Sequence, residues 1–379
     1  MIVIYTLIGF YFCCYIISIV RLCLGFKKIK TFKSDYSEVK TRFSVIVPLR
    51  NEAENISKLL KSFENIKYPY SLFEIIFVND DSTDNSASVI NKWRMQNTAI
   101  ATTMIENVRM SNSPKKDAIN RAIPIAQFEW IITTDADCMW KENSFSTYDN
   151  YIQKNDVRMI ASSVVYEKAK GFLQRFQQMD IISLQATTIG SFGLNNAFMA
   201  NGANFAYQKS FFKELNGFQS DTKITSGDDV FLLQKAFAKY PQQVQYLKSK
   251  NTIVSTSAET SWKDLFYQRV RWASKATSYQ SEYGEMLAVF VFLGNLSIVV
   301  SIFLTVFNLL PIVVLAALLI VKYLIDLWLL TLGNNFLKAE KWMFPFLSAI
   351  FYPFFNVIIG VYILIFGMKY HWKGRQFLR

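Results

Sequence analysis

The sequence contains a single histidine, His371, close to the end of the chain. One histidine argues against a Ser-His-Asp triad and against zinc sites built from several imidazoles. The cysteines are equally few, and no pair of them has the spacing of zinc ligands: Cys13, Cys14, Cys23 and Cys138. Three of these lie in an apolar N-terminal stretch. We therefore predict no disulfide framework and expect the soluble part of the chain to face a reducing compartment.

Internal repeats and low-complexity linkers are also missing, whereas apolar residues are abundant. Hydrophobic residues make up 51% and aromatic residues 16% of the 379 positions, which is high for a purely soluble protein. The length allows one catalytic domain together with membrane segments. The formal net charge of +12 fits a membrane surface, a phosphorylated substrate or a nucleic acid as partner. Basic residues that flank apolar segments account for most of this excess.

The N-terminal stretch, residues 2–25, has Arg21 as its one charged residue and is long enough to cross about 30 Å of hydrocarbon. A basic cluster follows it: Lys27, Lys28, Lys30 and Lys33. A cleaved signal peptide would carry its charges before the apolar run and a small-residue cleavage site after it, so we disfavour that alternative. The positive-inside rule places the cluster in the cytoplasm and the N-terminus outside.

Three further apolar stretches lie near the end of the chain, at about 286–307, 309–332 and 344–367. Lys322 and Asp326 lie four residues apart in the second, where they either pair within the membrane or leave Lys322 to snorkel toward water. Four spans from an outside N-terminus put the C-terminus outside, but the basic tail 369–379 predicts an inside end. Either the last stretch is re-entrant or interfacial, or the rule fails here.

Between the membrane segments, short apolar runs alternate with helical patterns. Strands are predicted at 43–47, 73–78, 102–105, 130–132 and 158–165, and helices at 52–66, 84–95 and 116–126. Ser82 and Thr83 are expected to cap the second helix. This order predicts an α/β fold with a parallel sheet, in which ligands bind beyond the carboxyl ends of the strands.

Two carboxylates, Asp135 and Asp137, directly follow the predicted strand 130–132. Alternate residues of an extended segment point the same way, so both side chains can face one site. Carboxylate oxygens suit Mg²⁺ or Mn²⁺, which usually share their coordination with substrate phosphates. An isolated Asp-x-Asp is also common in solvated turns, so the remaining motifs decide between the two interpretations.

Five motifs occur in order along the chain: Val-Ile-Val-Pro-Leu-Arg-Asn-Glu at 45–52, Phe-Val-Asn-Asp-Asp-Ser-Thr-Asp at 77–84, Asp-Ala-Asp at 135–137, Gly-Asp-Asp at 227–229 and Gln-Arg-Val-Arg-Trp at 268–272. This set resembles the family 2 inverting glycosyltransferases with a GT-A (Rossmann-like) fold. It is similar to their membrane-embedded branch, which includes cellulose, hyaluronan and poly-N-acetylglucosamine synthases and ceramide glucosyltransferase. The resemblance covers residues 43 to about 275.

The resemblance implies a UDP-sugar donor and roles for four carboxylates. Glu52 and Asp80 would bind the ribose and the base; taken without the resemblance, a helix N-terminus and a turn are the favoured explanation for them. The family's Asp-Asp-Gly-Ser is here Asn-Asp-Asp-Ser at 79–82, and of these we select Asp80. Asp137 is implied as the firmer metal ligand, and Asp135 as a contact of the metal or the ribose.

Two further segments are similar to donor and acceptor segments of the family. Lys115 lies in Ser-Pro-Lys-Lys-Asp-Ala-Ile-Asn at 113–120, where Pro114 replaces a glycine, and it is implied in donor binding. Gly202, in Asn-Gly-Ala-Asn at 201–204, is implied on the acceptor side and permits close backbone approach. An exposed lysine and a plain loop are the structural alternatives.

The pair Asp228 and Asp229 matches the family's catalytic position, with Asp228 where glutamate is usual. The resemblance implies Asp229 as the general base that takes a proton from the acceptor hydroxyl. The alternative is an acidic pair that caps a helix.

Residues 262–276 are predicted as a helix that begins with a capping box, Ser261 to Asp264. Gln268, Arg271 and Trp272 share one face of it. Arg271 can bind a pyrophosphate through its fork of donors, Gln268 can donate a hydrogen bond, and Trp272 offers a flat surface to a sugar or lipid. An apolar face just before a membrane segment also fits an element at the membrane interface.

The predicted organisation is an N-terminal transmembrane helix (1–26), a cytosolic catalytic domain (40–260), an interfacial helix (261–284), three apolar C-terminal stretches (285–368) and a basic tail (369–379). We expect an enzyme of the inner (plasma) membrane that uses Mg²⁺ or Mn²⁺ to transfer sugar from a UDP-sugar to a lipid or glycan. A processive polysaccharide synthase and a non-catalytic membrane scaffold are the alternatives. Nucleic acid is disfavoured as a partner, because much of the basic excess flanks apolar segments.

Overall fold

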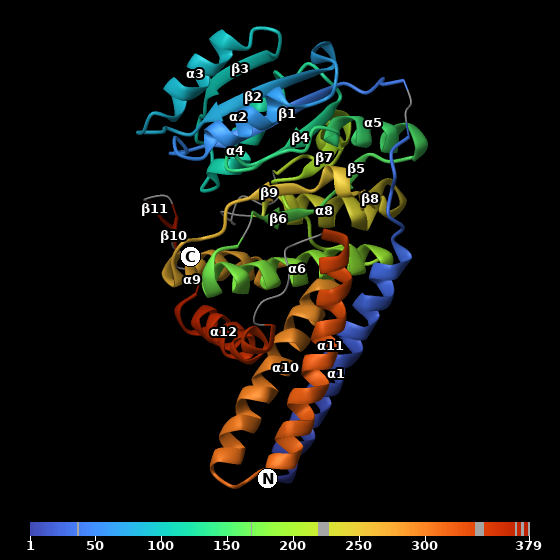
Figure 1. Cartoon of the computed structure of the whole chain (residues 1–379), viewed down its shortest axis with the longest axis vertical. Coiled ribbons are helices and arrows are strands. Elements are labelled where there is room, and N and C mark those ends of the chain that lie inside the picture. Colours follow the sequence, from blue (N-terminus) through green and yellow to red (C-terminus); the bar gives the residue numbers. More distant parts are fainter. Residues whose placement is uncertain are drawn as a thin grey trace. The chain divides into compact units, whose positions relative to one another are not determined.

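The computed structural model describes residues 1–35, 38–167, 169–218, 227–337, 345–367, 370–372 and 375–377. The chain forms two compact units (Figure 1). The sheet unit consists of Lys30–Glu167 and Ala197–Ser257, and the helical unit of Met1–Ile29, Lys168–Asn196 and Ala258–Arg379.

The sheet unit is built on a seven-stranded sheet with the order β3-β2-β1-β4-β7-β5-β8. Its strands are β1 (Phe43–Leu49), β2 (Phe73–Asn79), β3 (Ala101–Glu106), β4 (Trp130–Thr133), β5 (Met159–Ala161), β7 (Phe205–Gln208) and β8 (Val244–Tyr246). Strand β1 pairs in parallel with β2 and β4, and β2 with β3, whereas β7 is antiparallel to both neighbours. This confirms the predicted α/β fold. A second sheet contains β6 (Val164–Tyr166) and β9 (Val254–Thr256).

Helices connect these strands: α2 (Ile56–Glu64), α3 (Ser86–Gln96), α4 (Pro114–Ala122), α5 (Ser144–Lys154), α7 (Lys209–Glu214) and α8 (Asp228–Lys239). The predicted cap of α3 by Ser82 or Thr83 is wrong. Asp84 accepts from the backbone N–H of Ser86 at 3.0 Å, and the Ser82 hydroxyl accepts from the backbone N–H of Asn51 at 3.1 Å. The one strand expected at 158–165 is two strands, β5 and β6.

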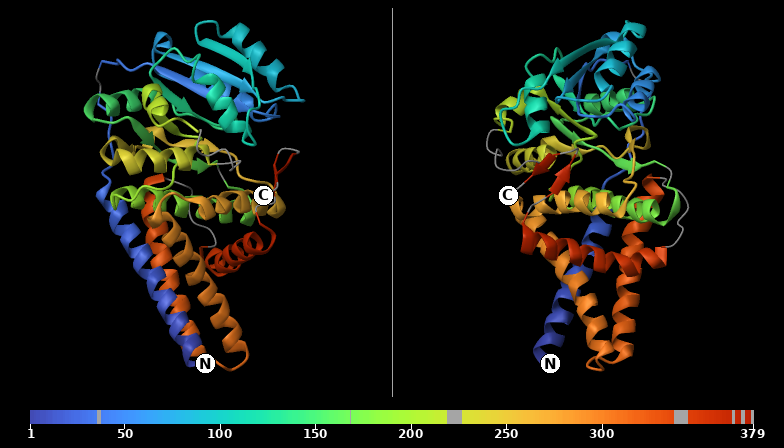
Figure 2. Two further views of the ribbon diagram at one scale, coloured as in Figure 1. Left: turned by 180° about the vertical axis from the view of Figure 1, so that it is seen from behind. Right: turned by 90° about the vertical axis from the view of Figure 1, so that its left-hand side faces the viewer.

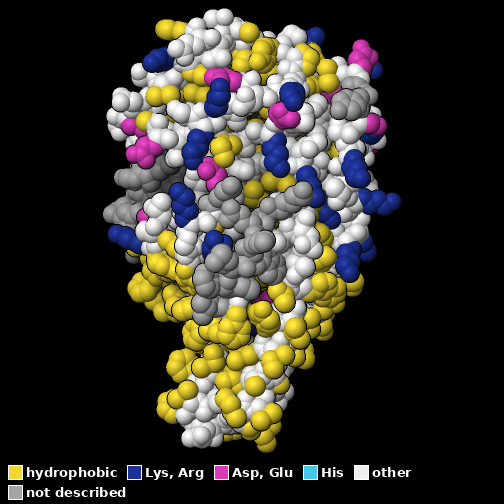
Figure 3. All heavy atoms as spheres, viewed as in Figure 1, with side chains coloured by type: hydrophobic (Ala, Val, Ile, Leu, Met, Phe, Trp, Pro, Cys, Tyr) yellow, Lys and Arg dark blue, Asp and Glu magenta, His cyan; other side chains and the backbone are white. Residues whose placement is uncertain are grey.

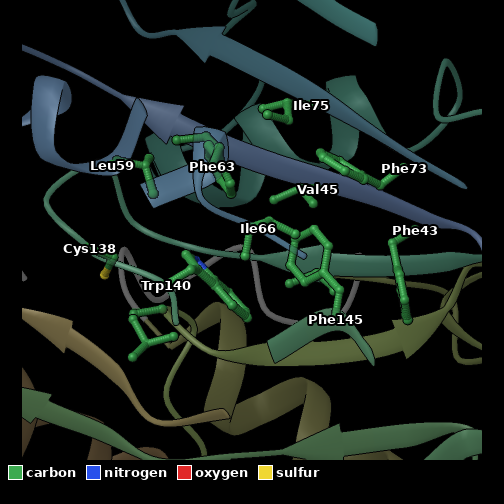
Figure 4. Packing of buried hydrophobic residues seen from close by; sticks show 14 of the residues in the cluster. Phe43, Val45, Leu59, Phe63, Ile66, Phe73, Ile75, Cys138, Trp140 and Phe145 are labelled. Carbon is green, nitrogen blue, oxygen red and sulfur yellow. The ribbon is translucent and has the colours of Figure 1, made fainter. Parts of the chain in front are cut away.

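The core of the sheet unit is rich in aromatic side chains (Figure 4). Phe145 of α5 packs edge-on against Phe73 of β2, with ring centroids 5.2 Å apart, and lies 5.7 Å from Phe43 of β1. Such pairs add to the stabilisation that burial itself provides. Strand β2 is buried along its whole length and β1 along nearly all of it, which is typical of parallel strands covered on both faces.

The helical unit contains α1 (Ile2–Lys28), α6 (Gly171–Gly193), α9 (Trp262–Ala273), α10 (Glu282–Val306), α11 (Ile312–Leu337) and α12 (Pro345–Phe366). Among the described residues, four helices are long and apolar enough to span a membrane: α1, α10, α11 and the part of α12 from Ala349 to Phe366. Hydrophobic side chains gather over α10 and α11 on the face that Figure 3 shows. The chain is thus suited to association with a membrane.

Helices α1, α10 and α11 run side by side, whereas α6, α9 and α12 run across them (Figure 2). The Tyr5 hydroxyl donates to the carbonyl oxygen of Leu309, so α1 begins beside the link between α10 and α11. The chain ends in a hairpin of β10 (Tyr370–Trp372) and β11 (Arg375–Phe377). The remaining residues of the predicted basic tail lie outside the described residues.

A polar triad lies between α1 and α11. The Lys322 ammonium donates to Asp326, lies 3.1 Å from the Tyr15 hydroxyl, and Tyr15 in turn donates to Asp326. Lys322 is only 4% exposed. Of the two alternatives for Lys322, pairing is therefore correct and snorkelling is wrong.

Candidate active site

Acidic side chains follow the ends of β2 and β4, the two strands that flank β1 in the sheet. Asp80 directly follows β2, and its backbone N–H donates to Leu49 of β1 at 2.8 Å. Beyond β4, the backbone N–H of Thr134 donates to Ile46 of β1 at 3.1 Å, and Asp135 comes next. The carboxyl ends of parallel strands share one edge of a sheet, which is where α/β proteins bind ligands.

Asp80 is buried and held by groups from the loop after β3. Arg109 binds it with two donors, at 3.1 Å to Oδ1 and 2.8 Å to Oδ2, and Asn107 Nδ2 donates to Oδ1 at 2.8 Å. Such a paired geometry gives direction as well as strength. The sequence motifs did not include Arg109 or Asn107. The one sign of their role in the sequence is their position after β3, the strand that pairs with β2.

The loop that carries Arg109 is fixed to the start of α4. The Asp117 carboxylate accepts from the backbone N–H groups of Met110 and Ser111, at 3.1 and 2.9 Å. Asn107 also donates to the carbonyl oxygen of Pro114 at 3.2 Å. Asp80 and the first turn of α4 are therefore connected through one loop.

Glu52 lies in the turn between β1 and α2 and is buried. Its carboxylate accepts from Asn55 Nδ2 at 3.0 Å, and its backbone N–H donates to Ser86 Oγ at 2.7 Å. Glu52 is thus held by the starts of two helices at the same edge of the sheet.

Lys115, in the first turn of α4, joins three of the predicted carboxylates. Its ammonium lies 2.6 Å from Asp135 Oδ1 and 3.6 Å from Asp228 Oδ2. Burial alone would lower the pKa of Lys115, but the charges of Asp135, Asp228 and Asp229 outweigh it and hold the pKa above its ordinary value. Side chains from α4, the end of β4 and the start of α8 therefore meet at one ammonium group.

Asp229 lies at the start of α8, where the helix dipole favours negative charge. Its Oδ2 accepts from the backbone N–H of Gly202 at 2.8 Å, and its Oδ1 from that of Val230 at 2.8 Å. A Cβ atom on Gly202 would lie 2.9 Å from Asp228 Oδ2 and 3.0 Å from Lys115 Nζ. The structure therefore brings the predicted acceptor-side glycine against the predicted base, and any side chain at this position would displace the Asp228 carboxylate or the Lys115 ammonium.

Asp137, the predicted metal ligand, accepts from Thr256 Oγ1 of β9 at 2.9 Å. The described residues contain no group of three or more His, Cys, Asp or Glu side chains that could hold a metal ion. Two carboxylates fit an ion that completes its shell with water and substrate phosphates, as Mg²⁺ and Mn²⁺ usually do. The donor set thus suits an ion that arrives with a phosphorylated ligand.

The predicted residues of the Gln-Arg-Val-Arg-Trp motif lie on α9, in the helical unit, which is described by itself. The predicted cap by Ser261 is confirmed, because Ser261 Oγ accepts from the backbone N–H of Asp264 at 3.1 Å, and the Asp264 carboxylate accepts from the Ser261 hydroxyl at 2.5 Å. The helix ends at Ala273 rather than at 276. Gln268 donates to Glu259 Oε1 at 2.6 Å. Arg269, the second residue of the motif and one to which the sequence assigned no role, has its guanidinium 4.2 Å from the centre of the Trp272 ring.

Comparison with known proteins agrees with the resemblance. Residues 44–216 match the model of the family "Glycosyl transferase family 2". The chain is 25% identical over 264 residues to "Probable glycosyltransferase YdaM" of Bacillus subtilis, which covers 66% of this chain and 60% of that protein. It is 23% identical over 253 residues to a poly-beta-1,6-N-acetyl-D-glucosamine synthase of Staphylococcus epidermidis, covering 65% of this chain and 57% of the relative. The matched regions thus span about three fifths of these relatives.

A solved structure with the same fold is a mannosyltransferase of Pyrobaculum calidifontis in complex with GDP-Man and Mn²⁺. It superposes with a TM-score of 0.63 and 17% identity, over 96% of this chain and 98% of that one. At this identity the match confirms the GT-A fold.

Proposed function

We propose that this chain, whose residues 44–216 match the model of glycosyl transferase family 2, is a glycosyltransferase that transfers a sugar, with inversion, from a UDP-sugar to a lipid or glycan acceptor at a membrane. One observation carries the proposal. Lys115 draws Asp135 and Asp228 together, so three motifs that lie far apart in the sequence share one site at the carboxyl edge of the sheet.

Asp135 and Asp137 would hold a divalent cation, Mg²⁺ or Mn²⁺. When bound, the ion neutralises charge on the nucleoside diphosphate leaving group. The Thr256 hydroxyl on Asp137 orients that carboxylate, as partners of metal ligands usually do. Lys115 lies close enough to Asp135 to add a second positive charge beside the phosphates.

Asp229 is proposed as the general base. Its oxygens accept the backbone N–H groups of Gly202 and Val230, which fix the carboxylate for the proton transfer. As the acceptor oxygen attacks the anomeric carbon, Asp229 takes its proton and the bond to the diphosphate breaks. A single displacement of this kind inverts the anomeric centre. The Asp228 carboxylate pairs with the Lys115 ammonium, and Asp228 lies in the same first turn of α8 as Asp229.

Asp80 and Arg109 form a pair suited to an N–H group beside a carbonyl group, as on the edge of uracil. A carboxylate oxygen can accept from the N–H while the guanidinium donates to the neighbouring oxygen. Guanine presents a similar edge, so GDP-sugars belong in the test beside UDP-sugars. Glu52 would bind ribose hydroxyls, and Arg271 and Gln268 of α9 would bind the pyrophosphate.

We propose that α1, α10 and α11 span the inner (plasma) membrane, and that α12 lies along its cytoplasmic face together with α6 and α9. The crossing arrangement within the helical unit supports this topology (Figure 2). Three spans from an outside N-terminus put the C-terminus inside, so the basic tail then obeys the positive-inside rule. The sheet unit would be cytoplasmic.

The small membrane part favours a single transfer to a lipid-linked acceptor, which requires only access to the membrane interface. Processive synthesis of a polysaccharide is the second candidate, and the similarity to a poly-beta-1,6-N-acetyl-D-glucosamine synthase favours it. A non-catalytic scaffold is disfavoured, because every predicted carboxylate is present.

The test uses membranes that contain the full-length chain, incubated with radiolabelled UDP-sugars and GDP-mannose in Mg²⁺ or Mn²⁺. Products are then sorted into lipid-soluble and polymeric fractions. We expect Asp137→Ala, Asp229→Asn and Arg271→Ala each to reduce transfer by about 10²–10⁴-fold without loss of folded protein. The control is Lys263→Ala, at an exposed position of α9. Near-normal UDP release by all three variants would contradict the proposal.

A further inference from the structure

An ion pair between α6 and α9 is buried almost completely within the helical unit. Asp180 accepts from Arg269, and their side chains are 7% and 6% exposed. Arg269 lies inside the Gln-Arg-Val-Arg-Trp motif at 268–272 but was assigned no role there, and Asp180 lies outside every motif. Removing the two charges from water is costly, and loss of one partner leaves the other charge uncompensated. We therefore ask which neighbouring residues Asp180 and Arg269 hold in place.

Arg269 makes three contacts that together fix the middle of α9. Besides its bond to Asp180, it donates to Gln268 Oε1, and its guanidinium lies 4.2 Å from the centre of the Trp272 ring. Gln268 in turn donates from its Nε2 to Glu259 Oε1 at 2.6 Å, so the hydrogen bonds continue from Arg269 through Gln268 to Glu259. Both Gln268 and Trp272 therefore have their orientation set by one buried guanidinium.

Helix α6 also holds the segment that leads into α9. Gln177 donates to the carbonyl oxygen of Glu259 at 2.8 Å and accepts from its backbone N–H at 2.9 Å. With the Asp180–Arg269 pair one turn further along α6, the segment before α9 and the helix itself are attached at two points. Two attachments fix the rotation of α9 about its own axis.

That rotation decides where Arg271 points. Arg269 and Arg271 are two residues apart, so they lie on nearly opposite sides of a helix with 3.6 residues per turn. Because Arg269 faces α6, Arg271 faces away from it. Rotation of α9 would turn Arg271 and Trp272 away from their present directions together.

We propose that Asp180 and Arg269 are positioning residues, which set Gln268, Arg271 and Trp272 in the orientation that sugar transfer requires. This inference rests on the proposed function of the chain. A guanidinium suits the task better than an ammonium group. It is planar, so it can stack on an indole and direct separate N–H groups to a carboxylate and an amide at once. A lysine could restore the ion pair alone.

The test compares Arg269→Lys, which keeps the ion pair, with Lys263→Ala on the exposed face of the same helix. Both are made in the full-length protein in lipid nanodiscs. For Arg269→Lys we expect kcat for UDP release to fall about 10- to 100-fold, as for a small misplacement of a reacting group, with unchanged thermal stability. The double variant Arg269→Lys/Trp272→Phe should be no slower than Trp272→Phe alone. Wild-type kcat in Arg269→Lys, or fully additive losses in the double variant, would overturn the inference.

A second readout does not depend on activity. The protein is labelled with 5-fluorotryptophan, and the ¹⁹F signal of Trp272 is assigned from its loss in Trp272→Phe. We expect Arg269→Lys and Asp180→Asn to shift or broaden that signal and Lys263→Ala to leave it in place. If no donor is turned over even by the wild type, the proposed function fails, and this spectrum still decides the positioning role. An unchanged Trp272 signal in Arg269→Lys would refute it.

Discussion

The two units each contain a lysine that pairs with aspartate, and the two arrangements differ. In the sheet unit, Lys115 is shared between Asp135 and Asp228. In the helical unit, Lys322 meets Asp326 and a neutral partner, Tyr15. The first ammonium is divided among acidic groups and lies at the edge of a sheet, whereas the second is matched by one carboxylate between helices.

We interpret the Lys115 cluster as part of the proposed ligand site and the Lys322 triad as a contact that holds two helices together. Under the proposed function, a metal ion bound to the nucleoside diphosphate would supply a further positive charge to the carboxylates that share the Lys115 ammonium. A one-to-one pair among apolar helices is complete without a ligand, and ionisable groups there are costly unless they are paired. The triad therefore attaches α1 to α11. Three substitutions sharpen this comparison, in order of decreasing effect.

The largest effect is expected at the triad. Lys322→Leu leaves the Asp326 charge among apolar helices, so we expect it to lower the free energy of unfolding by about 3–5 kcal/mol. The double variant Lys322→Leu/Asp326→Leu should lie much closer to the wild type, because no charge is left alone. Thermal unfolding in nanodiscs measures both, with Leu324→Ala at an exposed position of the same helix as control. Equal losses in the single and double variants would show that the pair does not act as a unit.

An intermediate effect is expected next to the predicted metal ligand. Thr256→Val keeps the shape of the side chain and removes the donor to Asp137. We expect the affinity for Mn²⁺ in the presence of UDP to fall about 10- to 100-fold. The control is Thr102→Val on the edge strand β3, where the wild-type Thr102 hydroxyl donates to the carbonyl oxygen of Ile100. This variant should bind Mn²⁺ as the wild type does. If both variants bind equally well, Thr256 does not orient a metal ligand.

The smallest effect is expected at a third lysine, Lys248 of the sheet unit. Burial lowers the pKa of Lys248 from 10.5 to about 8, so between pH 8 and 10.5 the unfolded chain binds more protons than the folded one. Stability should therefore rise with pH across this interval. Lys248→Met should raise the free energy of unfolding by about 1 kcal/mol at pH 7 and lose that advantage near pH 10. Melting temperatures of both proteins at pH 7 and pH 10 measure it, and a difference that does not depend on pH would count against the buried charge.

The fold was predictable because the central strands β1, β2 and β4 are mostly apolar runs bounded by turn residues. Asp135 and Asp137 were found by the same route, since they directly follow a buried strand. Arg109 was missed, because the loop after β3 carries no motif and its role follows only from the pairing of β3 with β2. Asp180 and Arg269 were missed for a similar reason. Nothing in the sequence of a buried helix face indicates which of its polar residues meet across helices.

The membrane topology could be predicted from the sequence only in part. Hydropathy predicts that the last apolar stretch can span a membrane, and α12 satisfies that criterion. Its direction across α1, α10 and α11 depends on packing within the helical unit, which composition does not encode. In the sequence, the one sign that α12 runs in a different direction was the conflict between four predicted spans and a basic C-terminal tail.

The most direct test of the central claim is the binding of Mn²⁺ to the full-length protein with and without UDP, followed by the paramagnetic resonance of free Mn²⁺. The carboxylates at the end of β4 should form a site that becomes tight only when UDP is present and that Asp137→Ala abolishes, while Asp35→Asn, an exposed aspartate of the sheet unit, binds as the wild type. Tight binding of Mn²⁺ with UDP that Asp137→Ala leaves unchanged would contradict the account.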